Sequence, residues 1–467
     1  MSEHVVIVGA GPGGYVAAIR AAQLGAEVTV VENDEVGGTC LNRGCIPTKA
    51  LVYSAEALEM VRHARDYGVE VAGEVTYSLE AMMKRKDKVV STQVKGIRSL
   101  FKSHKIRLIE GTGSLRDART VTVQLREGGT EDVAADRIIL ATGSRPANIP
   151  VFPLDGEKII SSDDALFLKK LPGTLLVIGA GVIGCEFAFI LNALGVKITM
   201  VEMMPHAIPL VDEEITALLE RELKKKKIKL YCDEKIESVK ENGEGKMVAS
   251  LASGKEIITD QVLVSIGRTF NTDGLNLDAA GVKVGPRGNI EVNEKLETSV
   301  PGIYAIGDVT GGILLAHVAS TEGIAAAENA LGKESPVDYS VVPGAIFTMP
   351  EIGTVGLTEA QAREKGFDVA VGTFPYRGLG KSHAMGKITG MAKIVADAKT
   401  DRLLGMHILG AHASDIVQEG ALVMKLGGTV RDLGDTIHSH PTLSEVVMET
   451  AHAVHGICIH LPKPKER

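Results

Sequence analysis

The sequence predicts an α/β protein in which two similar units, each built on a parallel sheet, are followed by a mixed α+β domain. Three observations lead to this prediction. The segment 5–32 is repeated at 175–202, with ten identical positions and no gap. Glycine supplies 52 of 467 residues, above the usual share of about 7%, as expected where backbone makes tight turns. The C-terminal part contains segments of alternating polarity such as 391–397.

Each copy of the repeat consists of an apolar strand, a G-x-G-x-x-G turn, a helix that ends at a glycine and a second strand that ends in Glu. The glycines of such a unit let a pyrophosphate approach the helix N-terminus, and the carboxylate accepts hydrogen bonds from a ribose 2′-hydroxyl. We therefore predict two bound dinucleotides. The predicted contacts are Gly9, Gly11, Gly14 and Glu32 in the first copy, and Gly179, Gly181, Ile183, Gly184 and Glu202 in the second.

Three later segments, 136–144, 260–268 and 301–309, are expected to be return strands of the two sheets. Each is apolar and carries a glycine near its end, where a cofactor can lie against the backbone. Proline-containing connections at 144–150 and 336–343 are plausible domain boundaries.

Composition excludes several classes of function. A net charge of −8, no tryptophan and 4% aromatic residues argue against a nucleic-acid-binding platform. No uncharged stretch is long enough to span a membrane, and the N-terminal segment lacks a basic region typical of a signal peptide, so we expect a cytoplasmic protein. Residues 83–107 carry nine Lys/Arg and one Asp. This run is interpreted as a solvated helix face, with docking of an acidic partner as the alternative.

Cys40 and Cys45 lie in the segment GGTCLNRGCIPTKAL, directly after the first repeat unit. Pro47 is expected at the first position of a helix, whose N-terminus would lower the pKa of a nearby thiol. Lys49 follows Cys45 by one helical turn and adds positive charge. No second Cys/His pair lies near, so no metal site is predicted, and five cysteines do not form a structural disulfide scaffold. We predict a redox-active disulfide beside a dinucleotide.

At this motif the chain resembles the pyridine nucleotide–disulfide oxidoreductases over its whole length, and most closely those members that oxidise dihydrolipoamide. The resemblance rests on the double fingerprint, the GGTCxNxGCxPxK segment, an ATG at 141–143 and a GD at 307–308. It also rests on HxHPTxxE at 438–445 and on 347–359, which matches the start of the family's dimerisation domain.

The resemblance implies two Rossmann-like dinucleotide-binding domains and a C-terminal α+β dimerisation domain. The implied domains are 1–148 (FAD-binding, with the redox disulfide), 149–272 (NAD-binding), 273–343 (central, completing the FAD site) and 344–467 (dimerisation). FAD contacts are assigned to Gly9, Gly11, Gly14, Glu32, Lys49, Gly113, Thr142, Gly143, Ser144, Asp308, Leu314, Leu315, Ala316 and His317. NAD is assigned to the second fingerprint with Glu202 and Gly267, because a carboxylate opposes the 2′-phosphate of NADP. Glu186 is expected near the nicotinamide, paired with Lys49.

The implied chemistry passes electrons from a dithiol through Cys40 and Cys45 to FAD and then to NAD⁺. His440 would be the general base, oriented by Glu445. In the family this histidine serves the disulfide of the other subunit, so the resemblance implies an obligate homodimer. The implied partners are lipoyl-carrying proteins and the acyltransferase core of 2-oxoacid dehydrogenase complexes, or a glycine-cleavage system.

Two alternatives remain open from the sequence. One is a related disulfide reductase that acts on glutathione, mercuric ion or another thiol. Glu202 disfavours its usual NADPH, and the C-terminal segment lacks a cysteine pair. The other is a nucleotide-sensing or docking protein without turnover, which the set of Cys40, Cys45 and His440 argues against. Arg43 departs from the apolar residue that many relatives have there, which places a charge near the cysteines and leaves substrate preference open.

Overall fold

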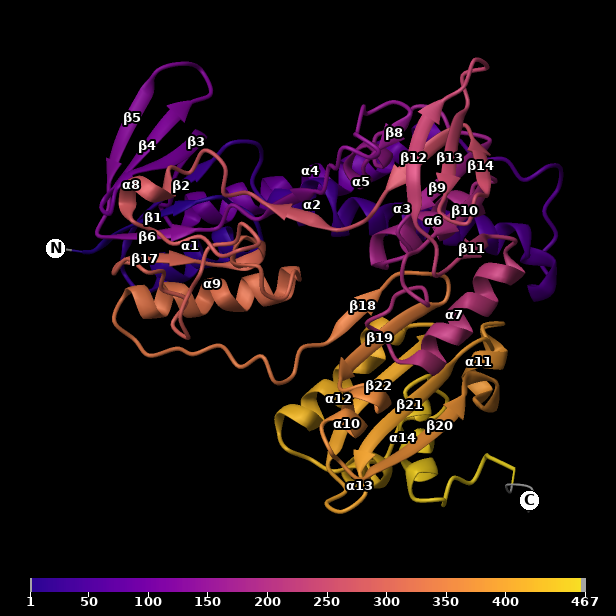
Figure 1. Ribbon diagram of the computed structural model, residues 1–467. Coiled ribbons are helices and arrows are strands. Elements are labelled where there is room, and N and C mark those ends of the chain that lie inside the picture. Colours follow the sequence, from indigo (N-terminus) through magenta and orange to yellow (C-terminus); the bar gives the residue numbers. More distant parts are fainter. Residues whose placement is uncertain (1, 463–467) are drawn as a thin grey trace.

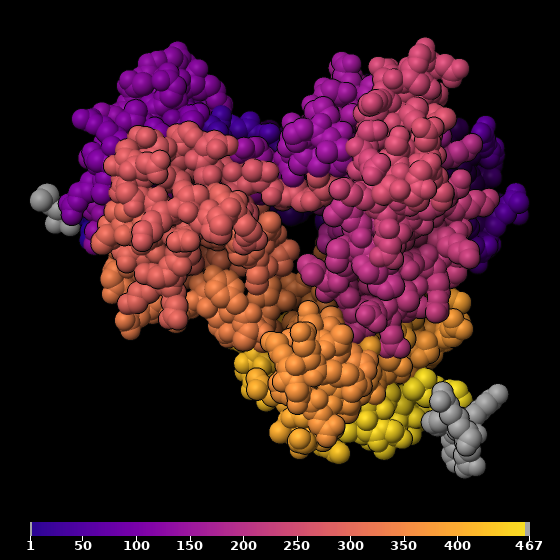
Figure 2. Space-filling model, in the orientation of Figure 1, coloured from indigo at the N-terminus to yellow at the C-terminus, as the bar shows by residue number. Residues whose placement is uncertain are grey.

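The structure is a computed structural model that describes residues 2–462. Figure 1 shows three groups of strands and helices: a sheet formed by N-terminal and central residues, a second sheet beside it, and a C-terminal sheet below the second. In the space-filling view the N-terminal strands and the residues near 300 share one lobe, and the segment around 200 forms another (Figure 2).

The first sheet has seven strands in the order β17-β6-β1-β2-β3-β4-β5. The centre of this sheet is parallel. The wholly apolar run 5–8 of β1 is buried because helices α1 and α9 cover one face of the sheet, and residues of β3 to β5 and of the segment 275–309 cover the other. The strands are β1 (His4–Val8), β2 (Glu27–Glu32), β3 (Arg107–Asp117), β4 (Thr120–Leu125), β5 (Thr130–Ala134), β6 (Arg137–Leu140) and β17 (Ile303–Ala305). The two helices are α1 (Pro12–Gln23) and α9 (Ala316–Ala330).

Three helices connect β2 to β3: α2 (Gly38–Arg43), α3 (Cys45–Arg62) and α4 (Leu79–Ser103). Ser78 caps α4 by accepting a hydrogen bond from Ala81 N–H. The basic run predicted to be a solvated helix face lies on α4, and most of its lysines are exposed. Lys86 is the exception: it is buried, donates to the Leu166 carbonyl at 2.7 Å and stacks on Phe167. Docking of an acidic partner on this face stays a prediction.

The second sheet is parallel, with the order β11-β10-β9-β15-β8, and an antiparallel sheet of three strands, β12 to β14, packs against it. The parallel strands are β8 (Ile159–Ile160), β9 (Thr174–Ile178), β10 (Lys197–Val201), β11 (Lys229–Tyr231) and β15 (Gln261–Val264). The antiparallel strands are β12 (Ile236–Glu241), β13 (Met247–Leu251) and β14 (Glu256–Thr259). The accompanying helices are α5 (Ser162–Ala165), α6 (Val182–Ala193) and α7 (Glu213–Lys225).

All three predicted return strands are confirmed. β6 pairs with β1, β15 pairs with β9, and β17 extends the first sheet by pairing with β6. The chain passes between the two sheets twice, and these passages form a small antiparallel pair of β7 (Ser144–Pro146) and β16 (Arg268–Phe270). Short helix α8 (Leu277–Ala280) follows the second passage. The exact domain boundaries stay predictions.

An extended segment runs from α9 to the C-terminal sheet (Figure 1). That sheet is entirely antiparallel, with the order β18-β19-β22-β21-β20, and helices α12 and α14 lie against it. Its strands are β18 (Gly344–Ile346), β19 (Glu351–Gly356), β20 (Val369–Pro375), β21 (Met391–Asp397) and β22 (Leu403–Gly410). Its helices are α10 (Glu359–Glu364), α11 (Gly380–Ala384), α12 (Ala413–Lys425), α13 (Val430–Asp435) and α14 (Glu445–Val454).

The alternating polarity of 391–397 correctly predicts a strand but not its environment. Six of the seven residues of β21 are buried, including Lys393, because the strand lies inside the sheet and is covered on both faces. No helix within residues 2–462 combines the length and apolar character needed to cross a bilayer.

Candidate active site

The two fingerprint turns have the same geometry. Gly9 and Gly179 adopt positive φ angles of 103° and 94°, which favour glycine, at the carboxyl ends of β1 and β9. Glu32 accepts the Ala10 N–H at 2.7 Å, and Glu202 accepts the Ala180 N–H at the same distance. Burial raises the pKa of Glu32 despite this hydrogen bond. Both carboxylates are therefore fixed beside the start of a helix.

The remaining fingerprint glycines have two roles, close packing and room for a ligand. A side chain at Gly14 would overlap the Gly9 carbonyl, and one at Gly184 would meet Ser265 Oγ at 2.7 Å, so both positions need glycine for close packing of helix on strand. A Cβ at Gly181 would meet nothing within 4 Å. The first turn of α6, whose N–H groups have no helical acceptors, thus faces open space next to Ile183, which fits a diphosphate.

The other predicted FAD residues lie at the same edge of the first sheet. Thr142, Gly143 and Ser144 follow β6, and Asp308 follows β17. Ser144 Oγ donates to Asp308 and accepts a hydrogen bond from Arg268 Nε at 2.6 Å, which brings the carboxylate and a cation to one place. Gly113 lies in β3 against valines of β1, β2 and β4. Leu314 and Leu315 directly precede α9, and Ala316 and His317 are its first two residues.

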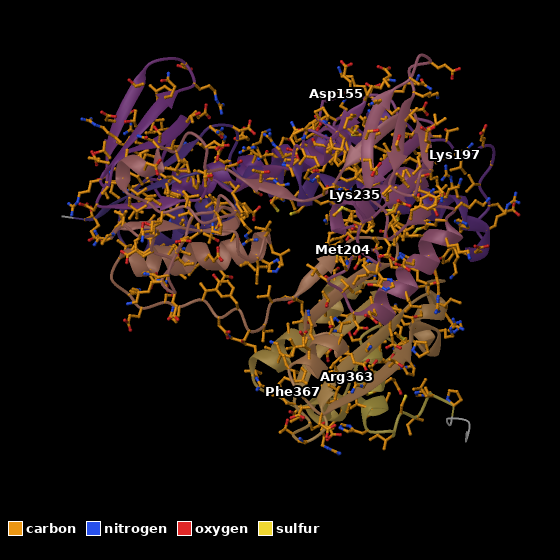
Figure 3. The ribbon with its side chains drawn as sticks, viewed as in Figure 1. Asp155, Lys197, Met204, Lys235, Arg363 and Phe367 are labelled. Atoms are coloured by element: carbon orange, nitrogen blue, oxygen red, sulfur yellow. The ribbon has the colours of Figure 1, made fainter. Side chains whose placement is uncertain are left out.

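Apolar side chains surround the acid of the second fingerprint. Met204 N–H donates to Glu202 Oε1 at 2.9 Å, and the side chain of Met204 is half exposed at the surface of this lobe (Figure 3). Met203 beside it is 66% exposed. A 2′-phosphate at this position would be repelled by the Glu202 carboxylate, whereas a ribose hydroxyl can donate a hydrogen bond to it. Gly267, also predicted to contact NAD, follows β15 with φ of 122°.

Cys40 lies on α2 and Cys45 is the first residue of α3, both as thiols. The prediction that this helix starts at Pro47 is wrong by two residues: Gly44 is the N-cap, and Pro47 sits within the first turn, where the missing N–H has no helical acceptor to lose. Cys45 is therefore closer to the helix N-terminus than predicted. The hydrogen bond from the Cys40 thiol and the charge of Lys49 lower the pKa of Cys45, although burial opposes them. The same hydrogen bond, together with burial, raises the pKa of Cys40.

The expected ion pair between Lys49 and Glu186 is present. Lys49 Nζ lies 2.9 Å from each oxygen of the Glu186 carboxylate, which is buried on α6. This pair joins α3, which carries Cys45, to the helix of the second fingerprint. The thiols, the ammonium and the carboxylate thus form one cluster between the two dinucleotide units.

His440 and Glu445 form the predicted hydrogen bond, with 2.8 Å between Nδ1 and Oε1. Thr442 N–H donates to the other oxygen at 2.9 Å, which fixes the carboxylate, and these hydrogen bonds lower the pKa of Glu445 although burial opposes them. A proline directly after His440 predicts that a helix starts at Pro441, but this prediction is wrong, because α14 begins at Glu445 and 440–444 form a turn. The His440 side chain is 75% exposed.

Within one chain the structure does not bring His440 to the cysteines. Figure 1 places α14 in the C-terminal domain and α2 in the upper part of the molecule, and no hydrogen bond among the described residues joins His440 to Cys40 or Cys45. His438, left without a catalytic role, is nearly buried and pairs with Glu419 at 2.7 Å.

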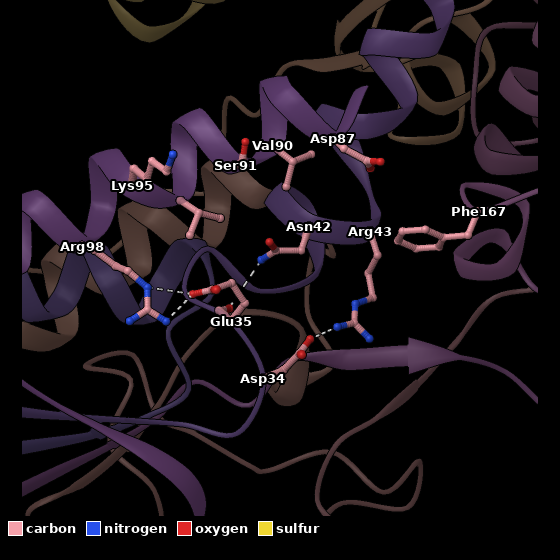
Figure 4. A pocket seen from close by; sticks show the side chains of 11 residues that line it. Asp34, Glu35, Asn42, Arg43, Asp87, Val90, Ser91, Lys95, Arg98 and Phe167 are labelled. Atoms are coloured by element: carbon pink, nitrogen blue, oxygen red, sulfur yellow. Dashed lines mark hydrogen bonds and ion pairs between the residues drawn. The ribbon is translucent and has the colours of Figure 1, made fainter. Parts of the chain in front are cut away.

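Arg43 forms an ion pair with Asp34 (Figure 4). The pair lies in a surface cavity of about 660 Å³ between α2, α4 and Phe167. The charges that act most on Cys45 are those of Lys49 and Glu186.

Three residues near the site were missed by sequence reasoning. Phe347 donates its N–H to Glu186, Arg268 contacts Ser144, and the buried Glu322 accepts the Gly307 N–H at 2.6 Å. Phe347 is the first residue of the segment 347–359, and Arg268 directly follows Gly267. Both residues therefore lie in or beside motifs recognised in the sequence, and they could have been proposed from them. Glu322 had only the weak signal of an acidic residue in a largely apolar helix.

Comparison with known proteins places this geometry in a family. The model of the pyridine nucleotide-disulphide oxidoreductases matches residues 3–323, and the model of their dimerisation domain matches 342–451. A dihydrolipoyl dehydrogenase of Thermus scotoductus is 43% identical over 98% of both chains. A mitochondrial dihydrolipoyl dehydrogenase of Pisum sativum is 41% identical over 98% of this chain and 93% of its own.

Solved structures show the same fold over nearly the whole chain. LpdA from Mycobacterium tuberculosis superposes with a TM-score of 0.91 at 29% identity, covering 96% of this chain and 99% of that one. The HOCl-induced flavoprotein disulfide reductase RclA from Escherichia coli gives a TM-score of 0.87 at 28% identity, covering 97% and 99%. The chain therefore belongs to the pyridine nucleotide-disulphide oxidoreductase family.

Proposed function

We propose that the protein is a dihydrolipoyl dehydrogenase, which oxidises protein-bound dihydrolipoamide to lipoamide and reduces NAD⁺ to NADH. The observation that carries this proposal is the cluster of Cys40, Cys45, Lys49 and Glu186 between two dinucleotide-binding turns. Likeness to dihydrolipoyl dehydrogenases over the full chain supports it. As partners we propose lipoyl-carrying proteins and the acyltransferase core of 2-oxoacid dehydrogenase complexes. The cytoplasmic location stays a prediction.

We propose that FAD binds the first fingerprint and NAD⁺ the second. The residues for FAD are those predicted from the sequence, with Arg268 added; apart from Lys49 on α3, they lie near one edge of the first sheet. When bound, FAD supplies a two-electron carrier between the dithiol and NAD⁺. Lys49 and Glu186 would face both cofactors, because their ion pair spans the two units.

The thiol chemistry follows from the two cysteines. A substrate thiolate attacks Cys40 Sγ of the oxidised pair, the Cys40–Cys45 bond breaks, and Cys45 leaves as a thiolate. The lowered pKa of Cys45 makes it the better leaving group of the two. The second thiolate of the substrate then attacks the substrate sulfur that is bonded to Cys40. This closes the substrate disulfide and releases Cys40 as a thiolate, which takes up a proton.

A base must remove the substrate protons, since a free thiol with a pKa of about 8.5 is mostly protonated at pH 7. His440 can accept them at Nε2, because Nδ1 is bonded to Glu445. The carboxylate fixes the imidazole and stabilises its charged form. Since His440 is remote from the cysteines of its own chain, we propose a homodimer in which it serves the partner's pair.

The exposed apolar residues of the C-terminal domain support the homodimer. Ile437, three residues before His440, is 96% exposed, and Leu422, Leu426 and Ile459 are also largely exposed. Large apolar side chains with this degree of exposure are compatible with a surface that another chain covers. The family's name for residues 342–451, a dimerisation domain, agrees with this proposal.

The proposal is tested with purified protein assayed on dihydrolipoamide with NAD⁺, on dihydrolipoamide with NADP⁺, and on oxidised glutathione with NADPH. We expect kcat/KM for NAD⁺ to exceed that for NADP⁺ about 100-fold, since a charge repelled by Glu202 costs about 2–3 kcal/mol. Faster turnover of glutathione with NADPH would favour the disulfide-reductase alternative. A colourless protein without turnover in any assay would favour the nucleotide-sensing alternative.

A further inference from the structure

Phe347 contacts both members of the Lys49–Glu186 pair from a third part of the chain. Its backbone N–H donates to Glu186 Oε1 at 2.9 Å, and the centre of its ring lies 4.4 Å from Lys49 Nζ. The first contact gives the buried carboxylate of Glu186 one of the hydrogen-bond donors that it needs. The second contact is a cation–π interaction with Lys49. Lys49 is therefore held on one side by a carboxylate and on another by an aromatic face.

The position of Phe347 is fixed by the C-terminal sheet. It follows β18, whose pairing with β19 places Ile346 opposite Ile352. Both isoleucines are buried in an apolar cluster that also contains residues of α3 and α6. Thr348 Oγ1 donates to the Pro350 carbonyl at 2.6 Å and closes the turn after Phe347. The ring thus reaches the ion pair from a rigid support in the dimerisation domain.

From this geometry we propose that Phe347 is a positioning residue of the redox centre, which holds Lys49 in place between Glu186 and Cys45. The charge of Lys49 favours the Cys45 thiolate and that of Glu186 opposes it. Loss of the ring leaves Lys49 held by Glu186 alone and lets water approach Nζ, which weakens its attraction to the thiolate. The dimerisation domain thereby sets the charge balance beside Cys45. This inference rests on the redox dithiol of the proposed function.

The test is the titration of Cys45 in the reduced holoenzyme, followed by thiolate absorbance as the difference from a Cys45→Ser variant. We expect Phe347→Leu to raise the Cys45 pKa by roughly half a unit to one unit, and Phe347→Tyr, which keeps the ring, to leave it close to the wild-type value. Phe347→Met serves as a second variant without a ring should the leucine variant fail to fold. Phe367→Leu is the matched control: Phe367 is a partly exposed aromatic residue of the same domain, away from the ion pair (Figure 3).

A Lys49→Met background distinguishes positioning from a general structural effect. If Phe347 acts through Lys49, then Phe347→Leu causes no further shift when Lys49 is already methionine. An equal shift in both backgrounds, or no shift in the wild-type background, would overturn the inference. The titration needs no substrate turnover, so its result is independent of whether dihydrolipoamide is the substrate.

Discussion

The two active-site cysteines differ in their pKa values because of their local surroundings. Cys45 occupies the start of α3, accepts a hydrogen bond from Cys40 and lies near Lys49, so its thiolate is stabilised. Cys40 donates that hydrogen bond, which together with burial raises the pKa of its own thiol. One thiol is thereby suited to leave and to carry negative charge, and the other to exchange with substrate and to take up a proton.

The first prediction concerns this difference in pKa. In the reduced protein Cys45 titrates below the ordinary thiol pKa of about 8.5, so the thiolate persists as the pH falls to neutrality. Cys40→Ala removes the hydrogen bond and raises the Cys45 pKa, whereas Cys40→Ser, which keeps a donor, raises it less. Thiolate absorbance across a pH series measures both.

The other cysteines do not interfere with this titration. Burial raises the pKa of Cys232 to about 11 and that of Cys458 to about 12, and the fully buried Cys185 is raised further. A step below the ordinary thiol range therefore belongs to Cys45. A Cys45 midpoint unchanged by Cys40→Ala would contradict the role given to the hydrogen bond.

The proposed redox residues could be named from the sequence because the family motif is local in the chain. The helix around Pro47 was misplaced by two residues, since proline is tolerated throughout the first turn and does not mark its first position alone. Phe347 was missed as a contact of Lys49 because nearly 300 residues separate them in sequence and only the packing of β18 brings them together. Tertiary contacts of this kind leave no periodic signal.

At the scale of elements, the repeat of strand, turn, helix and strand was predictable in detail. The glycines and the terminal Glu are needed at fixed offsets, and both copies show the same hydrogen bond from the residue after the first glycine to that Glu. The last helix was less predictable: α14 begins at Glu445 because residues 440–444 form a turn in which Thr442 N–H donates to the Glu445 carboxylate.

The alternating pattern of β21 predicted a strand but gave no sign that Lys393 is buried. The Lys393 side chain is 2% exposed, with Nζ at 3.0 Å from Asp212 Oδ1 and 2.7 Å from Glu214 and Glu359. Asp212 caps α7 of the second unit, so this cluster joins α7 to β21 and α10. A lysine can be buried here because three carboxylates surround it.

The second prediction is that Lys393→Met lowers the free energy of unfolding by about 3 kcal/mol, because it leaves the buried Asp212 carboxylate without its cation. Adding Asp212→Asn should recover part of the loss, since it removes the unpaired charge. Lys365→Met, at an exposed position of the same domain, should change stability by less than about 0.5 kcal/mol. Denaturant unfolding at neutral pH measures all three.

The pH dependence of this cluster has a defined sign. Hydrogen bonds from Lys393 and Arg363 lower the pKa of Glu359 against the effect of burial. The stability that the Glu359 carboxylate gives the folded state is therefore complete above the ordinary carboxyl pKa, and it is lost as the pH falls through the lowered pKa of Glu359. The difference between wild type and Lys393→Met should therefore shrink below about pH 4. An equal or larger difference in acid would contradict the ion-pair account.

At the scale of the whole molecule, the proposed function implies that each chain contains an incomplete site. The thiols and the Lys49–Glu186 pair lie between the two dinucleotide units, whereas the exposed His440 lies in the C-terminal domain. The family resemblance predicted this separation, which spacing in the sequence alone could not. A C2 dimer resolves it by placing the histidine of each chain at the thiols of the other.

The most direct test of this central claim is complementation between two inactive variants. Cys40→Ser and His440→Ala should each lack dithiol oxidation as homodimers. When the two chains are co-expressed in equal amounts, about half of the dimers are mixed and each has one intact site, so about a quarter of wild-type activity should return.

A matched pairing supplies the control. Cys40→Ser combined with Cys45→Ser leaves every site of a mixed dimer without one thiol, so no activity should return. Recovery of about a quarter of the activity in the first mixture and none in the second is the predicted result. No recovery in the first mixture, with mixed dimers shown to be present, would contradict a site shared between two chains.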